Sequence, residues 1–152
     1  ISNKYVLAET ALLNYYIDTP EYRAIIQNDL VGVFCADDLN REILLTIDDV
    51  LETSSHSPNL REVVLSRFKN EKLLKAELIL KPKHDYTLIE LDDCINQIKE
   101  RNLLSEENAI REKQRQLDPH IDVDEYKKLS ADVLSIRQRR ENIWKKTKSS
   151  KN

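Results

Sequence analysis

The sequence is poor in the residues that build tight turns and substrate-cradling loops. It contains one glycine, Gly32, and four prolines among its 152 residues. Glycine is common in phosphate-binding loops, oxyanion-binding turns and β-turns because it adopts backbone conformations that other residues avoid. The scarcity of glycine therefore argues against an enzyme, and we expect neither catalytic residues nor a cofactor in this chain.

Methionine is also absent, so we expect the chain to be a piece of a longer protein. The two cysteines, Cys35 and Cys94, are far apart and lack C-x-x-C spacing. No apolar run approaches the roughly 20 residues that a membrane-spanning helix needs, and no signal peptide is evident. Together these absences predict a cytoplasmic protein without a membrane partner.

The net charge of −3 conceals a gradient along the chain. Residues 1–98 carry 10 Lys or Arg against 17 Asp or Glu, whereas residues 118–152 carry 9 against 6. The basic residues that produce the C-terminal excess are Arg137, Arg139, Arg140, Lys145, Lys146, Lys148 and Lys151. An acidic body is thus followed by a basic end.

Apolar residues at helical spacing predict an all-α fold. Within the first 98 residues the apolar stripes predict five short helices, at about residues 5–16, 20–30, 39–51, 60–68 and 71–81. Thr19 and Ser57 are each expected to cap a helix whose first position is a proline. Asp37 or Asp38 is the expected cap of the third helix, and Gly32 is expected to adopt a left-handed conformation after the second.

A longer helix is predicted from about residue 88. Thr87 and Glu90 have capping-box spacing, in which each side chain satisfies a backbone N–H at the helix start. Apolar residues are frequent on one face of this helix as far as Ile98 and are sparser after it. This change indicates a helix that extends beyond the body of the protein. The sequence leaves open whether this helix continues through residues 102–105, where Ser105 has the character of a new cap.

A turn at residues 118–122 separates this helix from a last one at about 124–147, which Asp122 or Asp124 is expected to cap. The apolar residues of the last helix fall within an arc of about 100° at helical spacing; they are Tyr126, Leu129, Val133, Ile136, Ile143 and Trp144. We therefore predict a globular multi-helix bundle at 1–98, a helical hairpin at 99–149 and a disordered tail at 150–152.

Residues with metal-binding or catalytic potential occur in patterns that favour structural roles. The three histidines, His56, His84 and His120, fall in predicted loops without metal-site spacing. Adjacent aspartates, as at residues 48–49, point about 100° apart on a helix and do not converge on one ion. Cys94 lies on an apolar stripe and is expected to be a small core residue.

The hairpin is the feature that suggests binding. Counting back from the turn places Leu103 opposite a residue near 138, so Ile143 and Trp144 must either pack near Ile98 or stay uncovered. Leu134 lies off the apolar arc and is expected to be exposed. Apolar groups of this size beside arginines are typical of protein-binding surfaces. The candidate partner-binding residues are Leu134, Arg137, Arg139, Arg140, Ile143 and Trp144.

The layout resembles the C-terminal helicase-binding domain of bacterial DnaG-type primases. The resembling segments, spread over essentially the whole chain, are residues 8–15, residues 30–34 leading into 37–51, and residues 91–98, 110–115 and 126–144. The family's domain has a helical body followed by a helical hairpin. The resemblance therefore implies the same division in this chain.

The resemblance also implies a function and a partner. The family's hairpin docks on the N-terminal collar of the DnaB-type replicative helicase, which recruits primase for primer synthesis during DNA replication and modulates the helicase. The zinc-binding and polymerase domains of such a primase would precede Ile1. The alternative from the residues alone is a helical nucleic-acid-binding or transcription-regulatory domain that uses the basic end. Since aromatic residues for base stacking are scarce there, we expect at most weak, nonspecific nucleic-acid binding.

Overall fold

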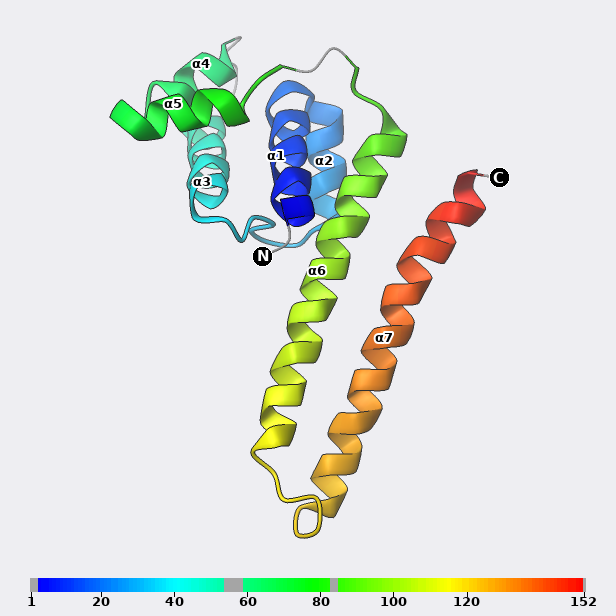
Figure 1. Cartoon of the computed structure of the whole chain (residues 1–152). Helices are drawn as coiled ribbons and strands as arrows, with labels where there is room; N and C mark the ends of the chain where they lie inside the picture. The colour runs from blue at the N-terminus through cyan, green and yellow to red at the C-terminus, as the bar shows by residue number, and fades with distance from the viewer. Residues whose placement is uncertain (1–2, 54–58, 83–84, 152) are drawn as a thin grey trace. The chain divides into compact units, whose positions relative to one another are not determined.

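The computed structural model of the chain describes residues 3–53, 59–82 and 85–151, with side chains among residues 4–145. Within these ranges it contains seven helices and no strand, which confirms the all-α prediction (Figure 1). The helices are α1 (Asn3–Asp18), α2 (Pro20–Asp29), α3 (Asp38–Thr53), α4 (Leu60–Leu65), α5 (Asn70–Ile79), α6 (Leu88–Arg115) and α7 (Val123–Lys151).

The chain divides into two compact units, which are called the body and the hairpin from here on. The body is Ile1–Ile95 and the hairpin is Asn96–Asn152. The division falls within α6, between residues 95 and 96, whereas the sequence places it between residues 98 and 99. The start of α6 therefore belongs to the body, and the rest of that helix forms the first limb of the hairpin.

The core of the body is built around α1. This helix packs against α2, α3 and α4, and Leu12, Leu13 and Tyr15 are completely buried. Ile43 and Ile47 on α3 are also completely buried. Since α1 has neighbours on several sides, its apolar stripe is wider than that of a helix lying on a surface.

A buried carboxylate joins α1 to the start of α3. Glu9 is 1% exposed and accepts hydrogen bonds from the backbone N–H groups of Ala36 and Asp37 and from the side chain of Asn40. The carboxylate of Asp37 in turn accepts the backbone N–H of Asn40 at 3.1 Å, which makes Asp37 the predicted cap of α3. Polar contacts thus fix the position of α3 on α1.

The structure confirms only some of the predictions for the two ends of α2. Pro20 occupies the first turn of α2, and Gly32 has a φ of +84°, in the left-handed region that favours glycine. The Thr19 hydroxyl, however, donates to the carbonyl of Tyr15 at 2.7 Å and does not cap α2. The prediction of a Thr19 side-chain cap is therefore wrong, because the hydroxyl is directed to the end of α1 and accepts no backbone N–H of α2. The predicted Ser57-Pro58 start lies outside the described residues.

The start of α6 is anchored by a tyrosine of α1. The Thr87 hydroxyl accepts the Glu90 N–H at 3.2 Å, as the capping box predicts. The Thr87 N–H donates to the Tyr15 hydroxyl at 3.0 Å, a contact between residues that are 72 positions apart in the chain. Tyr15 thus supplies an acceptor that a capping box assigns to the glutamate side chain.

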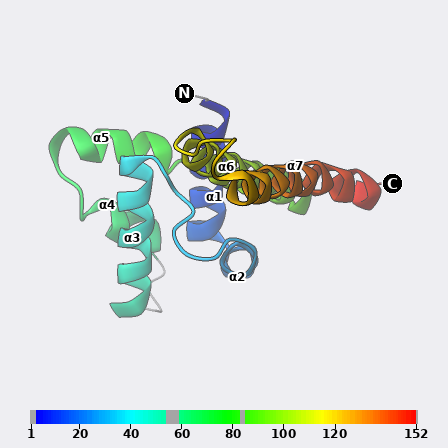
Figure 2. The same cartoon turned by 90° about the horizontal axis from the view of Figure 1, so that it is seen from below.

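The hairpin consists of two antiparallel helices. The second limb, α7, runs back along α6 (Figures 1 and 2). α6 is unbroken from Leu88 to Arg115, so no new helix starts at Ser105. α7 extends to Lys151, beyond the predicted hairpin end at residue 149, and Asn152 lies outside the described residues.

Candidate binding surface on the hairpin

The two limbs of the hairpin pack along an apolar seam. Leu103 on α6 is 7% exposed, and Val133 and Ile136 on α7 are 7% and 3% exposed. Near the turn, the Gln114 side-chain amide donates to the Ser130 hydroxyl at 2.6 Å and to the Tyr126 carbonyl at 3.2 Å. These contacts fix which residues of α6 and α7 face one another.

An ion cluster lies further along the hairpin, centred on Glu107. This carboxylate is 8% exposed and is approached by three guanidinium groups. Its Oε1 is 3.4 Å from Nε of Arg137 and 3.3 Å from Nη2 of Arg140, while its Oε2 is 3.3 Å from Nε of Arg111. One carboxylate therefore faces three positive charges, and the cluster retains an excess of positive charge.

The cluster is also incompletely hydrogen-bonded. The Nε of Arg140 is buried and has no hydrogen-bond partner among the described residues. Arg139, which directly precedes Arg140 on α7, lies 4.0 Å from Glu106, and both side chains are more than half exposed. Exposed pairs of this kind contribute little to stability, so Glu107 is the dominant acidic group of the cluster.

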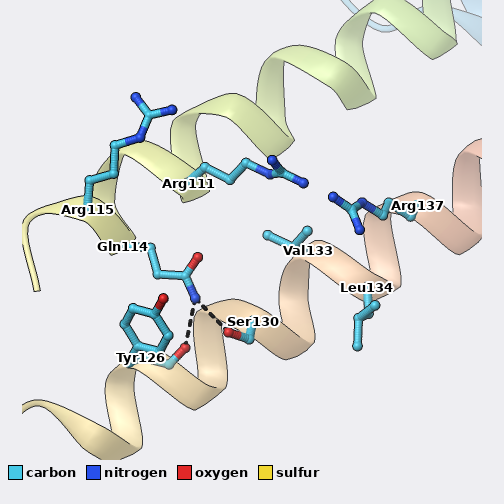
Figure 3. A pocket seen from close by; sticks show the side chains of 8 residues that line it. All are labelled: Arg111, Gln114, Arg115, Tyr126, Ser130, Val133, Leu134 and Arg137. Carbon is cyan, nitrogen blue, oxygen red and sulfur yellow. Dashed lines mark hydrogen bonds between the residues drawn. The ribbon is translucent and has the colours of Figure 1, made fainter. Parts of the chain in front are cut away.

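A pocket of about 480 Å³ lies between the limbs, from the ion cluster toward the turn (Figure 3). The side chains that line it are Arg111, Gln114, Arg115, Tyr126, Ser130, Val133, Leu134 and Arg137. In Figure 3, Arg111 from α6 and Arg137 from α7 extend toward one another, and Leu134 projects from α7 away from α6. We call this feature the hairpin pocket.

The predicted site residues separate into two groups. Leu134 and Arg137 line the hairpin pocket, and Leu134 is 64% exposed, which confirms the exposure expected from its position off the apolar arc. Arg140 contacts Glu107 but does not line the pocket. Ile143 and Trp144 are half-buried on α7 and lie outside the pocket.

The pocket residues that come from α6 were not predicted from the sequence. Arg111, Gln114 and Arg115 follow one another at helical spacing, as do Tyr126, Ser130 and Arg137 on α7. These spacings are visible in the sequence. Polar stripes also occur on any solvated helix face, however, and only the antiparallel pairing of α6 with α7 turns the two stripes toward one another.

The other residues that could in principle act as metal ligands or catalysts are not gathered into a site among the described residues. Asp48 accepts a hydrogen bond from the Tyr16 hydroxyl, and Asp49 pairs with Arg67 at 2.9 Å. Cys35 and Cys94 are buried and are not joined in a disulfide. His120 is exposed in the turn, and His56 and His84 lie outside the described residues. Among the described residues, no group of three or more potential ligands is arranged to hold a metal ion.

None of the described helices combines the length and the apolar character needed to cross a membrane. Comparisons with protein-family models, with curated proteins and with solved structures found no match to this chain.

Proposed function

We propose that this chain is the helicase-binding module of a bacterial primase, and that its hairpin docks on the N-terminal domain of a DnaB-type replicative helicase. Under this proposal the chain does no chemistry of its own. It recruits the primase to the helicase for primer synthesis and modulates the helicase there. The proposal starts from the resemblance of residues 8–15, 91–98 and 126–144 to the corresponding parts of that family's domain.

The observation that supports docking through the hairpin is the pairing of arginines with an exposed leucine in one pocket. Arg111, Arg115 and Arg137 line the hairpin pocket together with Leu134, which is 64% exposed. Arginine is enriched among the residues that dominate binding energy, and an exposed leucine gains free energy when a partner covers it. A partner that covers Leu134 would therefore meet the arginines in the same contact.

Nucleic-acid binding is the second candidate function, and the ion pairs of the hairpin count against it. Arg137 and Arg140 lie within 3.4 Å of Glu107, and Arg115 is 2.9 Å from Glu112. A phosphate backbone that approached these arginines would also approach the two carboxylates. The electrostatic gain from neutralising phosphates would therefore be reduced.

The experiment that tests the proposal is size-exclusion chromatography of the 152-residue chain with the replicative helicase of the same organism. We expect co-elution at low salt and micromolar concentration, and loss of co-elution when the helicase lacks its N-terminal domain. Separate elution from the intact helicase under these conditions would reject the proposal. The truncated helicase is the matched control, because it keeps the motor domain and removes only the expected docking surface.

A second measurement separates the two candidate functions. A DNA-binding domain loses affinity for a generic duplex steeply as salt rises, with a log–log slope close to the number of phosphates contacted. We expect weak duplex binding without sequence preference. Submicromolar affinity for duplex DNA at physiological salt would reverse the ranking of the two functions.

A further inference from the structure

The walls of the hairpin pocket carry charge of one sign. Three of the eight lining residues are arginines, and none is acidic. Glu107 is not among the lining residues, but its carboxylate contacts Arg111 and Arg137 through their Nε atoms. Three lining arginines against the two carboxylates that pair with them, Glu107 and Glu112, leave a small net positive charge, which favours a single negatively charged group over a run of phosphates.

The two facing arginines retain hydrogen-bonding capacity for such a group. A guanidinium has five N–H donors in a planar fork that matches a carboxylate, and the contacts to Glu107 occupy only part of them. Arg111 and Arg137 come from opposite limbs and extend toward one another (Figure 3). A carboxylate placed between them would accept hydrogen bonds from both helices.

The rest of the pocket is suited to an apolar side chain. Val133 lies in the seam at 7% exposure, Leu134 projects at 64% exposure, and Tyr126 is half-buried between them and the turn. Gln114 is already bonded to Ser130 and Tyr126, so its amide stays within the hairpin. An apolar group entering here would cover Leu134 without breaking these hydrogen bonds.

We infer that the hairpin pocket binds an acidic and apolar protein segment, whose carboxylate lies between Arg111 and Arg137 and whose neighbouring apolar side chain covers Leu134. The inference rests on the proposed function only for the identity of the protein that carries the segment, namely the helicase N-terminal domain. Complementary charge is the reason for choosing an acidic segment. The exposed leucine beside the arginines is the reason for choosing a protein over a nucleic acid.

The first test measures the affinity of the helicase N-terminal domain for pocket variants of the full chain. Arg111→Gln and Leu134→Ser should each weaken binding by about tenfold or more, as for charged and apolar groups at the centre of an interface. The matched controls are Lys128→Gln on the opposite face of α7 and Ile121→Ser in the turn; both residues are exposed and neither lines the pocket. Thermal melting of every variant separates a loss of binding from a loss of folding.

Charge exchange at Arg115, the third lining arginine, then tests whether the segment that enters the pocket is acidic. Arg115→Glu changes a side chain that is 74% exposed, so its effect on folding is expected to be small. The variant should bind weakly, and one Asp→Arg or Glu→Arg substitution on the helicase domain should restore its affinity. Rescue by none of the helicase domain's acidic residues would overturn the acidic part of the inference.

A second test addresses the pocket without the helicase. Backbone amide spectra of the full chain are recorded during titration with a blocked peptide that alternates glutamate with leucine. The controls are a glutamine–leucine peptide, a glutamate–serine peptide and a short DNA duplex. Shifts at Gln114, Ser130, Val133 and Leu134 with the first peptide, and weaker shifts with every control, support the inference.

The results of the two tests distinguish a failure of the proposed function from a failure of the pocket inference. If the helicase domain does not bind but the glutamate–leucine peptide produces the pocket shifts, the proposed function is wrong and the pocket inference stands. If the helicase domain binds equally to the parent chain and the pocket variants, the inference is wrong and the proposed function stands. Equal shifts with the DNA duplex, or with the glutamine–leucine peptide, would also overturn the acidic-segment assignment.

Discussion

Glu107 on α6 and Arg140 on α7 form an ion pair across the hairpin, with 3.3 Å between Oε1 and Nη2. The carboxylate is 8% exposed and the arginine side chain is 27% exposed. Arg137 and Arg111 share the same carboxylate. Glu107 therefore keeps three like charges close together at the seam between the limbs.

Replacing Glu107 by Gln should destabilise the hairpin. The substitution keeps the shape of the side chain but leaves the arginines to repel one another, and we expect a loss of about 2 kcal/mol in the free energy of unfolding. Urea denaturation measures this loss. Glu106→Gln is the matched control, since its 4.0 Å pair with Arg139 is exposed, and it should cost less than about 0.5 kcal/mol. Equal losses in both variants would contradict a special role for Glu107.

A second prediction concerns Arg61, which joins α4 to α1. Its guanidinium donates at 3.0 Å to Asn14, to Asp18 and, through Nε, to the carbonyl of Leu80. Lysine has one ammonium group and no planar fork, so it cannot reproduce three divergent contacts. Arg61→Lys should lower the free energy of unfolding by about 2 kcal/mol, measured by chemical denaturation.

The control for Arg61 is another arginine that pairs with an aspartate. Arg67 meets Asp49 at 2.9 Å, but the two side chains are 46% and 55% exposed. Arg67→Lys should therefore change stability by less than about 0.5 kcal/mol. If the two substitutions have the same effect, the multiple contacts of Arg61 contribute nothing beyond a single surface pair.

The positions of the helices followed from the sequence because the core imposes helical spacing on apolar residues. The stripe of α3 places Ile43, Ile47 and Val50 on one face, and all three are completely buried. Asp37 and Thr87 were also recognisable as caps, because capping depends on residues within a few positions of one another. Local periodicity and local hydrogen bonds are thus visible in one sequence.

Contacts between distant residues were not predictable in this way. Glu9 shows no sign in the sequence that it would be buried under residues 36–40, and Tyr15 none that it would meet Thr87. The register of the hairpin, by contrast, was predicted approximately. If Leu103 lies opposite a residue near 138, Glu107 lies opposite a residue near 134. Helical side chains lean toward the N-terminus of their own helix, so Arg137 reaches back to that level.

The third prediction concerns alkaline pH. Burial, together with a hydrogen bond to Asp48, raises the pKa of Tyr16 to about 12. Because the folded-state pKa lies above the unfolded value of about 10, the protonated phenol stabilises the fold below pH 10, and this contribution is lost as the pH rises toward 12. Stability should fall over this window by up to about 1.4 kcal/mol per pH unit from this group alone.

Comparison with Tyr16→Phe isolates the contribution of Tyr16. The variant has no ionisable phenol, so the difference in free energy of unfolding between parent and variant should shrink between pH 10 and 12. Ultraviolet absorbance titration of the folded protein gives an independent measurement. If all six tyrosines ionise together near pH 10, the raised pKa is wrong.

The fourth prediction concerns independent folding of the body. Residues 1–98 keep Leu91, Ile95 and Ile98, which are at most 1% exposed. This fragment should unfold cooperatively and retain a near-ultraviolet circular dichroism spectrum, because the apolar stripes of its six helical segments are enough to close a core. The control fragment, residues 1–86, lacks α6 and should lose that spectrum. A molten fragment 1–98 would show that the domain boundary is wrong.

The last prediction separates binding residues from stabilising ones on α7. Leu134 is 64% exposed in the free protein, so Leu134→Ala should leave the melting temperature nearly unchanged. Under the proposed function it should weaken helicase binding by about 2 kcal/mol, the scale of an apolar anchor. Ile143 and Trp144 are half-buried, so their alanine variants should lower the melting temperature, as expected for a loss of about 1 to 2 kcal/mol of packing.

The arginines are expected to act on the rate of association. Reversing the charge at Arg139 and Arg140 should slow binding to the helicase and alter its salt dependence, because charges at the edge of an interface act mainly through long-range attraction. Reversal at Arg140 should also lower the melting temperature, since it removes the ion pair with Glu107, whereas reversal at the exposed Arg139 should not. Isothermal calorimetry gives the affinities, stopped-flow kinetics gives the rates, and thermal melting of the same variants gives the stabilities. If Leu134, Ile143, Trp144 and the two arginines can all be substituted without loss of helicase affinity while changes on the acidic body abolish it, docking occurs through the body. The hairpin mechanism would then be rejected even with helicase binding established.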